Sequence, residues 1–145
     1  MKHPLGRYAV FATIAVVVVI GWLVMADRHT PPEGADLSRS KASVGGAYEV
    51  SIEPEAEPVR QGPLHTWLAS VRLSDGTPAA NVRIDVDGGM PAHGHGLPTA
   101  PKASHEGDGV YRIEGVRFNM GGLWELRLSI DGPAGEDEVV FNIEL

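Results

Sequence analysis

The regular alternation of apolar and polar side chains near the C-terminus constrains the fold more than any other feature. In the segment WELRLSID, residues 124–131, every second residue is apolar and each residue between is polar. Successive side chains of a β-strand point to opposite faces of a sheet. The segment is therefore predicted to be an antiparallel strand with one buried face and one face in water.

The same period of two recurs in other segments, and short glycine-containing turns separate them. Strands are predicted at residues 47–53, 64–73, 81–87, 111–118, 124–131 and 139–143. Turns are predicted at Asp75-Gly76, Gly88-Gly89, Asp108-Gly109, Gly121-Gly122 and Asp131-Gly132, because these dipeptides reach the positive φ values of tight turns. This pattern predicts an all-β fold, an immunoglobulin-like antiparallel β-sandwich of about seven strands with no helix of its own.

An uncharged apolar stretch precedes this domain. Residues 8–26, YAVFATIAVVVVIGWLVMA, would span roughly 28 Å as a helix, close to the hydrocarbon thickness of a bilayer. Lys2 and Arg7 lie before it, which places the N-terminus in the cytoplasm. We expect one N-terminal transmembrane helix in the cytoplasmic (inner) membrane, with the domain on the extracytoplasmic or periplasmic side. A signal peptide cleaved after Ala26 is the alternative, and it also exports the domain.

Three regions follow from these patterns: an N-terminal transmembrane anchor or uncleaved signal sequence (1–27), a polar, breaker-rich linker (28–46) and the β-sandwich domain (47–145). The whole chain has a formal net charge of −7 with 12 basic and 19 acidic residues. Without Lys2 and Arg7, residues 27–145 carry 10 − 19 = −9. An acidic surface repels phosphate backbones, so no nucleic-acid partner is expected.

No catalytic motif stands out. The chain has no Gly-x-Ser-x-Gly and no glycine-rich phosphate loop, and it has no cysteine for a thiolate nucleophile or a disulfide. Asp85 and Asp87 fit the wet face of a strand better than a catalytic pair. We therefore expect a protein that is not an enzyme.

The segment MPAHGHGLPTAP, residues 90–101, brings a thioether and two imidazoles together within six residues. Thioether and imidazole ligands together favour copper, Cu(I) above all. The candidate metal ligands are Met90, His93, His95 and Met120. Alternatively, the methionines fill gaps in the core and the histidines cap loop carbonyls. His65 is either a hydrogen-bonded buried histidine or a further ligand, and His105 is expected to be exposed in a loop.

Several segments together resemble the YtkA-like family, which is related to the FixH proteins and is sometimes labelled auxin-binding protein. They are PLHTW (63–67), MPAHGHGLPTAP (90–101) and DGVYRIEGVRFNMGGLWEL (108–126), within a match over about residues 47–144. The resemblance implies a membrane-anchored extracytoplasmic β-sandwich linked with copper handling or respiratory oxidase assembly. It marks Met90, His93, His95 and Met120, with His65 as a neighbour. This chain departs from the usual Met-Pro-Gly by reading Met120-Gly121-Gly122, and no basic anchor for an auxin carboxylate is evident.

Three functions remain open at this point. The first is a copper-binding accessory protein that works with a membrane protein complex or a metallochaperone. The second is a metal-independent interaction module that docks onto a membrane complex, and the third is a carrier of a small organic ligand.

Overall fold

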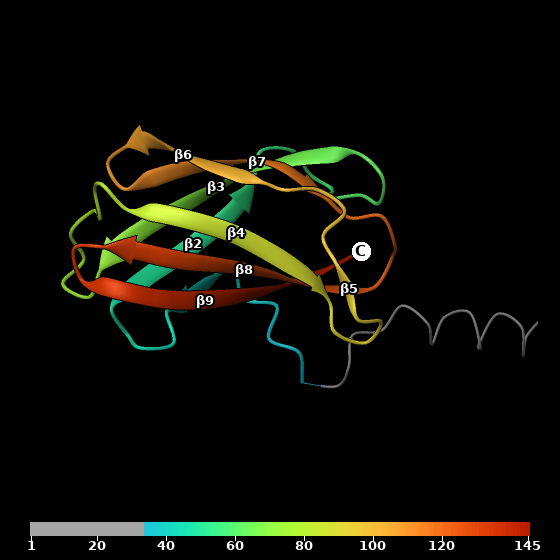
Figure 1. Cartoon of the computed structure of the whole chain (residues 1–145), viewed down its shortest axis with the longest axis horizontal. Coiled ribbons are helices and arrows are strands. Elements are labelled where there is room, and N and C mark those ends of the chain that lie inside the picture. The colour runs from blue at the N-terminus through green and yellow to red at the C-terminus, as the bar shows by residue number, and fades with distance from the viewer. Residues whose placement is uncertain (1–33) are drawn as a thin grey trace, which may run out of the picture.

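The computed structural model describes residues 34–145, which form two antiparallel β-sheets packed face to face (Figure 1). The predicted transmembrane helix and the first part of the predicted linker lie outside these residues. Among residues 34–145, no helix is long and apolar enough to cross a membrane. The all-β prediction with two antiparallel sheets is confirmed.

The first sheet has five strands and the second has four. The first has the order β1 (Ser40–Ala42), β2 (Tyr48–Pro54), β3 (Leu64–Leu73), β7 (Val110–Arg117) and β6 (Lys102–Gly107). The second has the order β5 (His95–Gly96), β4 (Arg83–Met90), β8 (Leu123–Gly132) and β9 (Gly135–Glu144). Without the short strands β1 and β5, the orders β2-β3-β7-β6 and β4-β8-β9 are those of constant-type immunoglobulin sheets.

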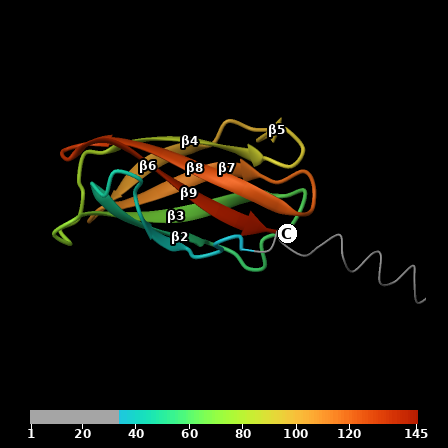
Figure 2. The same ribbon diagram turned by 90° about the horizontal axis from the view of Figure 1, so that it is seen from below.

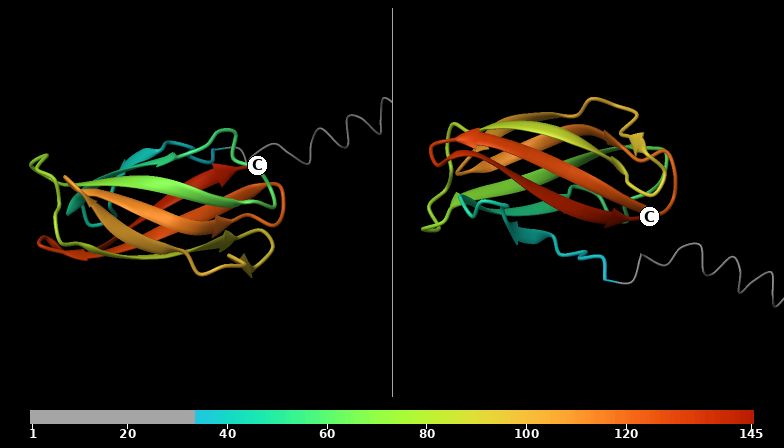
Figure 3. Two further views of the ribbon diagram at one scale, coloured as in Figure 1. Left: turned by 90° about the horizontal axis from the view of Figure 1, so that it is seen from above. Right: turned by 60° about the horizontal axis from the view of Figure 1, so that its bottom comes forward.

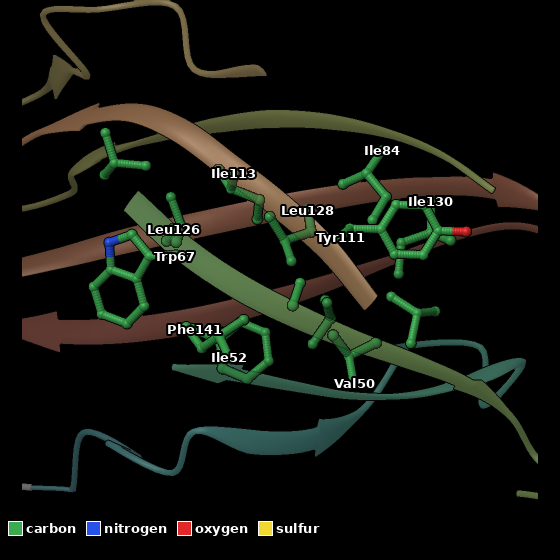
Figure 4. Close-up of a cluster of buried hydrophobic side chains, with 14 of the residues drawn as sticks. Val50, Ile52, Trp67, Ile84, Tyr111, Ile113, Leu126, Leu128, Ile130 and Phe141 are labelled. Atoms are coloured by element: carbon green, nitrogen blue, oxygen red, sulfur yellow. The ribbon is translucent and has the colours of Figure 1, made fainter. Parts of the chain in front are cut away.

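The core lies between the two sheets, and Figure 2 shows the same ribbon from below. The alternation in β8 directs Trp124, Leu126, Leu128 and Ile130 inward, and each is at most 1% exposed. Figure 4 shows these leucines and Ile130 facing Ile113 and Tyr111 from the opposite sheet. The predicted buried face of this strand is therefore the one that packs in the core.

Two predicted turns lie inside strands. Gly88 and Gly89 belong to β4, where a Cβ on either residue would collide with a carbonyl oxygen of a neighbouring strand. The Gly-Gly pair therefore permits a close approach of backbones rather than a reversal. Asp131-Gly132 ends β8, and the reversal occurs at residues 133–134.

Three strands, β1, β5 and β6, occur where the sequence predicts none. Strand β6 contains His105, which was expected in a loop, although its predicted exposure is correct. Strand β1 lies in the segment expected to be linker, and its residues pair with Ser51, Val50 and Glu49 of β2. All three are edge strands with mostly exposed side chains, so none has the apolar alternation that would mark it.

The segment around β1 also covers the free edge of β9. Lys41 Nζ donates a hydrogen bond to the carbonyl of Val140 (3.1 Å), and the backbone N–H of Val44 donates to Glu138 (2.8 Å). The Asn142 amide donates to the carbonyl of Asp36 (2.9 Å). An uncovered edge strand is a template for pairing with another chain. The folded region therefore begins before residue 47.

Candidate functional site

All four predicted metal ligands lie at one end of the sandwich, where β4 ends and β8 begins. Figure 3 shows β5 and the connection from β7 to β8 side by side at this end, close to the C-terminus. We call it the histidine end and define it by residues 90–96 together with the methionine loop, residues 118–122. The prediction that these segments lie at strand ends is supported by the bounds of β4, β7 and β8.

Met90 is the last residue of β4. Its side chain lies on the same face of the strand as that of Ile84 and points into the core. Its side chain is 3% exposed. Its terminal methyl lies 3.2 Å from the position that a Cβ on Gly122 would occupy. Gly122 also has a φ of +113°, a conformation that favours glycine. Met90 therefore packs directly against the methionine loop.

The histidine turn, residues 91–94, reverses the chain between β4 and β5. The N–H groups of His93 and Gly94 both donate to the carbonyl of Met90, at 3.0 and 2.9 Å. His95 then pairs with Met90 across the two strands. The imidazole rings of His93 and His95 are exposed, and their centroids are 6.3 Å apart. Both rings can therefore meet a ligand from solvent.

The methionine loop is tied to the rest of the domain through its backbone carbonyls. The N–H of Gly62 donates to Phe118 (2.8 Å), and the Gln61 amide donates to Asn119 (2.9 Å). The indole N–H of Trp124 donates to Met120 (3.0 Å). Gly122 and Leu145 also exchange backbone hydrogen bonds, at 2.9 and 3.2 Å. The methionine loop is therefore held on several sides.

Met120 itself is half-buried and packs against the edge of the core. The side chains that fasten its loop were not among the residues predicted for the site. Trp124 was identified only as a core residue of a strand, and Gln61 carried no signal in the sequence. Hydrogen bonds from distant segments to backbone carbonyls leave no spacing pattern that a single sequence could show.

His65 faces a different neighbourhood. A β-bulge separates it from Trp67, and its ring stacks 6.0 Å from that of Phe118. Its Nε2 lies 2.8 Å from the carbonyl oxygen of Arg60. The same Nε2 lies 3.3 Å from the backbone N of Arg60, and the tautomer of the ring decides which of the two contacts is a hydrogen bond. His65 is therefore hydrogen-bonded to Arg60, as one of the two predictions states, but it is half-buried rather than buried.

The histidine end offers thioether and imidazole groups as possible metal ligands rather than a cluster of carboxylates. Across residues 34–145, no three His, Asp or Glu side chains gather as a metal-binding group. A metal at the histidine end would therefore need the thioethers as well as the imidazoles. Next to β5, a shallow pocket on the outer face of the second sheet is lined by Gly89, Gly96, Glu125 and Arg127.

Comparisons with known proteins agree with this architecture. A family model described as YtkA-like matches residues 43–129, more than half of the chain. The crystal structure of a DUF4426 family protein from Pseudomonas aeruginosa PAO1 is similar with a TM-score of 0.53 and 12% sequence identity. That similarity covers 74% of this chain and 94% of the other, and at this identity it shows the fold alone. A search of curated proteins found no match.

Proposed function

The chain belongs to the YtkA-like family, and from this membership and the histidine end we propose that it binds copper, as Cu(I), outside the cytoplasm. It then serves copper handling or the assembly of a respiratory oxidase, and it is not itself an enzyme. The observation that carries the proposal is the packing of buried Met90 against the loop that bears Met120, next to two exposed imidazoles.

The chemistry of these side chains suits Cu(I) better than other ions. Thioether sulfur is a soft ligand that discriminates against magnesium and calcium, which prefer oxygen donors. Imidazole suits copper and zinc alike, so the thioethers supply the preference for copper. The two donor types would also have different tasks, because the methionines are buried or half-buried whereas His93 and His95 face solvent. Exposed imidazoles are suited to exchanging an ion with a partner.

The proposed location rests on the sequence. Residues 8–26 would hold the domain at the cytoplasmic membrane with its sandwich outside, as the basic residues before the span predict. Attachment to the membrane raises the effective concentration of the domain near a membrane protein complex. Such a complex, or a metallochaperone, is the proposed partner.

The test is anaerobic titration of the full chain, in detergent, with Cu(I) against a competing chelator. Wild-type protein is expected to bind one Cu(I), and the double variant His93→Ala, His95→Ala is expected to lose that affinity. His105→Ala is the matched control, because His105 is also exposed but lies on β6, where it stacks on Tyr111. Full binding by the double variant would contradict the proposed ligands.

A metal-independent docking module is the second candidate, favoured by one observation. Leu64 begins β3, beside the methionine loop, and it is 65% exposed. A single exposed apolar side chain is ordinary on a protein surface, so this candidate rests on the position of Leu64 beside the loop rather than on its exposure. A wild-type chain that binds no Cu(I) but still associates with a membrane complex, and loses that association in Leu64→Ser, would favour this candidate.

A further inference from the structure

The two fully buried tryptophans use their indole N–H groups in different ways. The N–H of Trp124 donates to the carbonyl of Met120 at 3.0 Å. Trp67 is equally buried, yet its indole N–H has no hydrogen-bond partner within residues 34–145. Buried N–H groups normally have partners. The hydrogen bond of Trp124 therefore satisfies a buried donor and also holds the backbone at Met120, whereas the indole of Trp67 holds no other segment in this way.

Trp124 is itself firmly placed. Its ring is completely buried and packs edge-on against Phe118, with centroids 5.4 Å apart and planes at 62°. The carbonyl of Phe118 in turn accepts the hydrogen bond from Gly62. The chain is thus anchored by aromatic packing on both sides of Met120, at Phe118 and at Trp124. The indole N–H points from this anchored ring to the carbonyl of Met120.

Gln61 holds the same loop from the solvent side. It is exposed, and its amide donates to the carbonyl of Asn119, the residue immediately before Met120. The carbonyls of Asn119 and Met120 are therefore held by two side chains from different parts of the fold. Methionine has three rotatable side-chain bonds, so a fixed backbone is needed before its sulfur can be presented at a defined place.

We infer that Trp124 and Gln61 are positioning residues that fix the Met120 thioether for metal binding. The inference rests on the proposed copper function. Trp124 acts through the carbonyl of Met120 and does not touch the metal.

The first experiment compares two matched variants of the full chain, Trp124→Phe and Trp67→Phe, by anaerobic Cu(I) titration. Each removes one buried indole, but only Trp124→Phe removes a hydrogen bond to the methionine loop. Because partners beyond the direct ligands commonly contribute tenfold or more to metal affinity, we expect Trp124→Phe to weaken Cu(I) binding about tenfold. Trp67→Phe is expected to leave the affinity unchanged.

A double-mutant cycle separates positioning from a general loss of packing. In a Met120→Leu background, Trp124→Phe should cause no further loss of Cu(I) affinity, because the group that it positions is gone. Gln61→Ala changes an exposed residue and should not affect folding, so it tests the inference even if Trp124→Phe folds poorly. It is expected to weaken binding in the same direction and to a smaller extent. Equal losses in the two tryptophan variants, or a loss that persists without Met120, would overturn the inference.

A measurement without metal distinguishes this inference from the copper proposal. The chain contains four methionines, so ¹³C-methyl methionine NMR gives few signals. In the metal-free protein, Trp124→Phe should increase the mobility of the Met120 methyl, and Trp67→Phe should not. Wild-type protein that binds no Cu(I) would overturn the proposed function. An unchanged Met120 methyl in Trp124→Phe would instead overturn the positioning role.

Discussion

The two ends of the sandwich are built differently. At the end opposite the histidines, which we call the latch end, residues 43–47 and the start of β9 are joined through one carboxylate. Asp137 accepts hydrogen bonds from the hydroxyl of Ser43 (2.6 Å) and from the N–H groups of Gly45, Ala47 and Glu138. Within residues 34–145, in contrast, the histidine turn makes only the two internal backbone bonds to Met90. The latch end is thus fastened by one carboxylate, whereas the histidine end combines a methionine loop tied to distant segments with a turn whose imidazoles stay free for a ligand.

Tyrosine hydroxyls reinforce the latch end. The hydroxyl of Tyr48 donates to Gly135 (2.8 Å) and accepts from the N–H of Ala134 (3.2 Å). That of Tyr111 donates to Ala79 (2.7 Å) in the same manner. Long-range bonds of this kind connect segments far apart in sequence. The comparison suggests that stability depends more on the latch end and that binding depends on the histidine end, as is common where loops are carried on a rigid scaffold.

Replacing Asp137 should have the largest effect on stability. Asp137→Ala removes a charged acceptor of several hydrogen bonds and leaves the buried Ser43 hydroxyl without this partner. We expect a loss of about 2–3 kcal/mol in the free energy of unfolding, measured by urea denaturation. Cu(I) affinity should not change. A variant that keeps its stability but loses its metal would show that the two ends are not separate in this way.

The carboxylate of Asp137 should also make the stability of the fold depend on pH. Hydrogen bonds from Ser43 and from the backbone of Gly45 hold the pKa of Asp137 well below its ordinary value. Because the folded pKa is lowered, the stabilisation is complete above the unfolded value of about 3.9 and is lost as the pH falls toward the folded pKa. The stability difference between wild type and Asp137→Ala should therefore shrink in acid below about pH 4. A difference that stays constant down to pH 2 would contradict this assignment.

A smaller effect is expected from the segment that covers β9. A chain beginning at residue 35 keeps Asp36 and Lys41, which contact Asn142 and Val140 of β9. A chain beginning at residue 44 loses both contacts together with β1. We expect the shorter chain to be less stable by about 1–2 kcal/mol and to self-associate through the uncovered edge. Urea denaturation and sedimentation velocity would measure both, and identical behaviour of the two chains would mean that this segment is only a tether.

Sequence reasoning succeeded where one face of a strand is buried and failed at the edges. The pattern of residues 124–131 predicted β8 because every second side chain of this strand is apolar and enters the core. Strands β1 and β6 have no such face, so their backbone pairing left no pattern of burial. The turn predicted at Gly88-Gly89 was wrong because glycine occurs both in turns and where two backbones approach closely. Only the neighbouring carbonyl groups, which the sequence does not show, distinguish the two cases.

The candidate site was predictable in its chemistry but not in its support. Methionine and histidine are distinctive residue types, so their positions could be named directly from the sequence. Their gathering at one end depended on the strand order, in which β4 and β8 are neighbours. The hydrogen bond from Trp124 to Met120 joins a core residue to a loop carbonyl, and a single sequence contains no signal for such a contact.

The smallest effect on stability should come from the residues that matter most for the proposed function. The rings of His93 and His95 are exposed, and within residues 34–145 neither ring has a hydrogen-bond partner. Surface substitutions of this type usually change stability by less than about 0.5 kcal/mol. The double variant His93→Ala, His95→Ala should therefore unfold in urea at the wild-type midpoint in the absence of metal. With Cu(I) present, the wild type alone should be stabilised, because a ligand that binds only the folded state raises its stability. A metal-free double variant as unstable as Asp137→Ala would instead mean that the histidine turn helps to hold the fold, and the contrast between the two ends would be wrong.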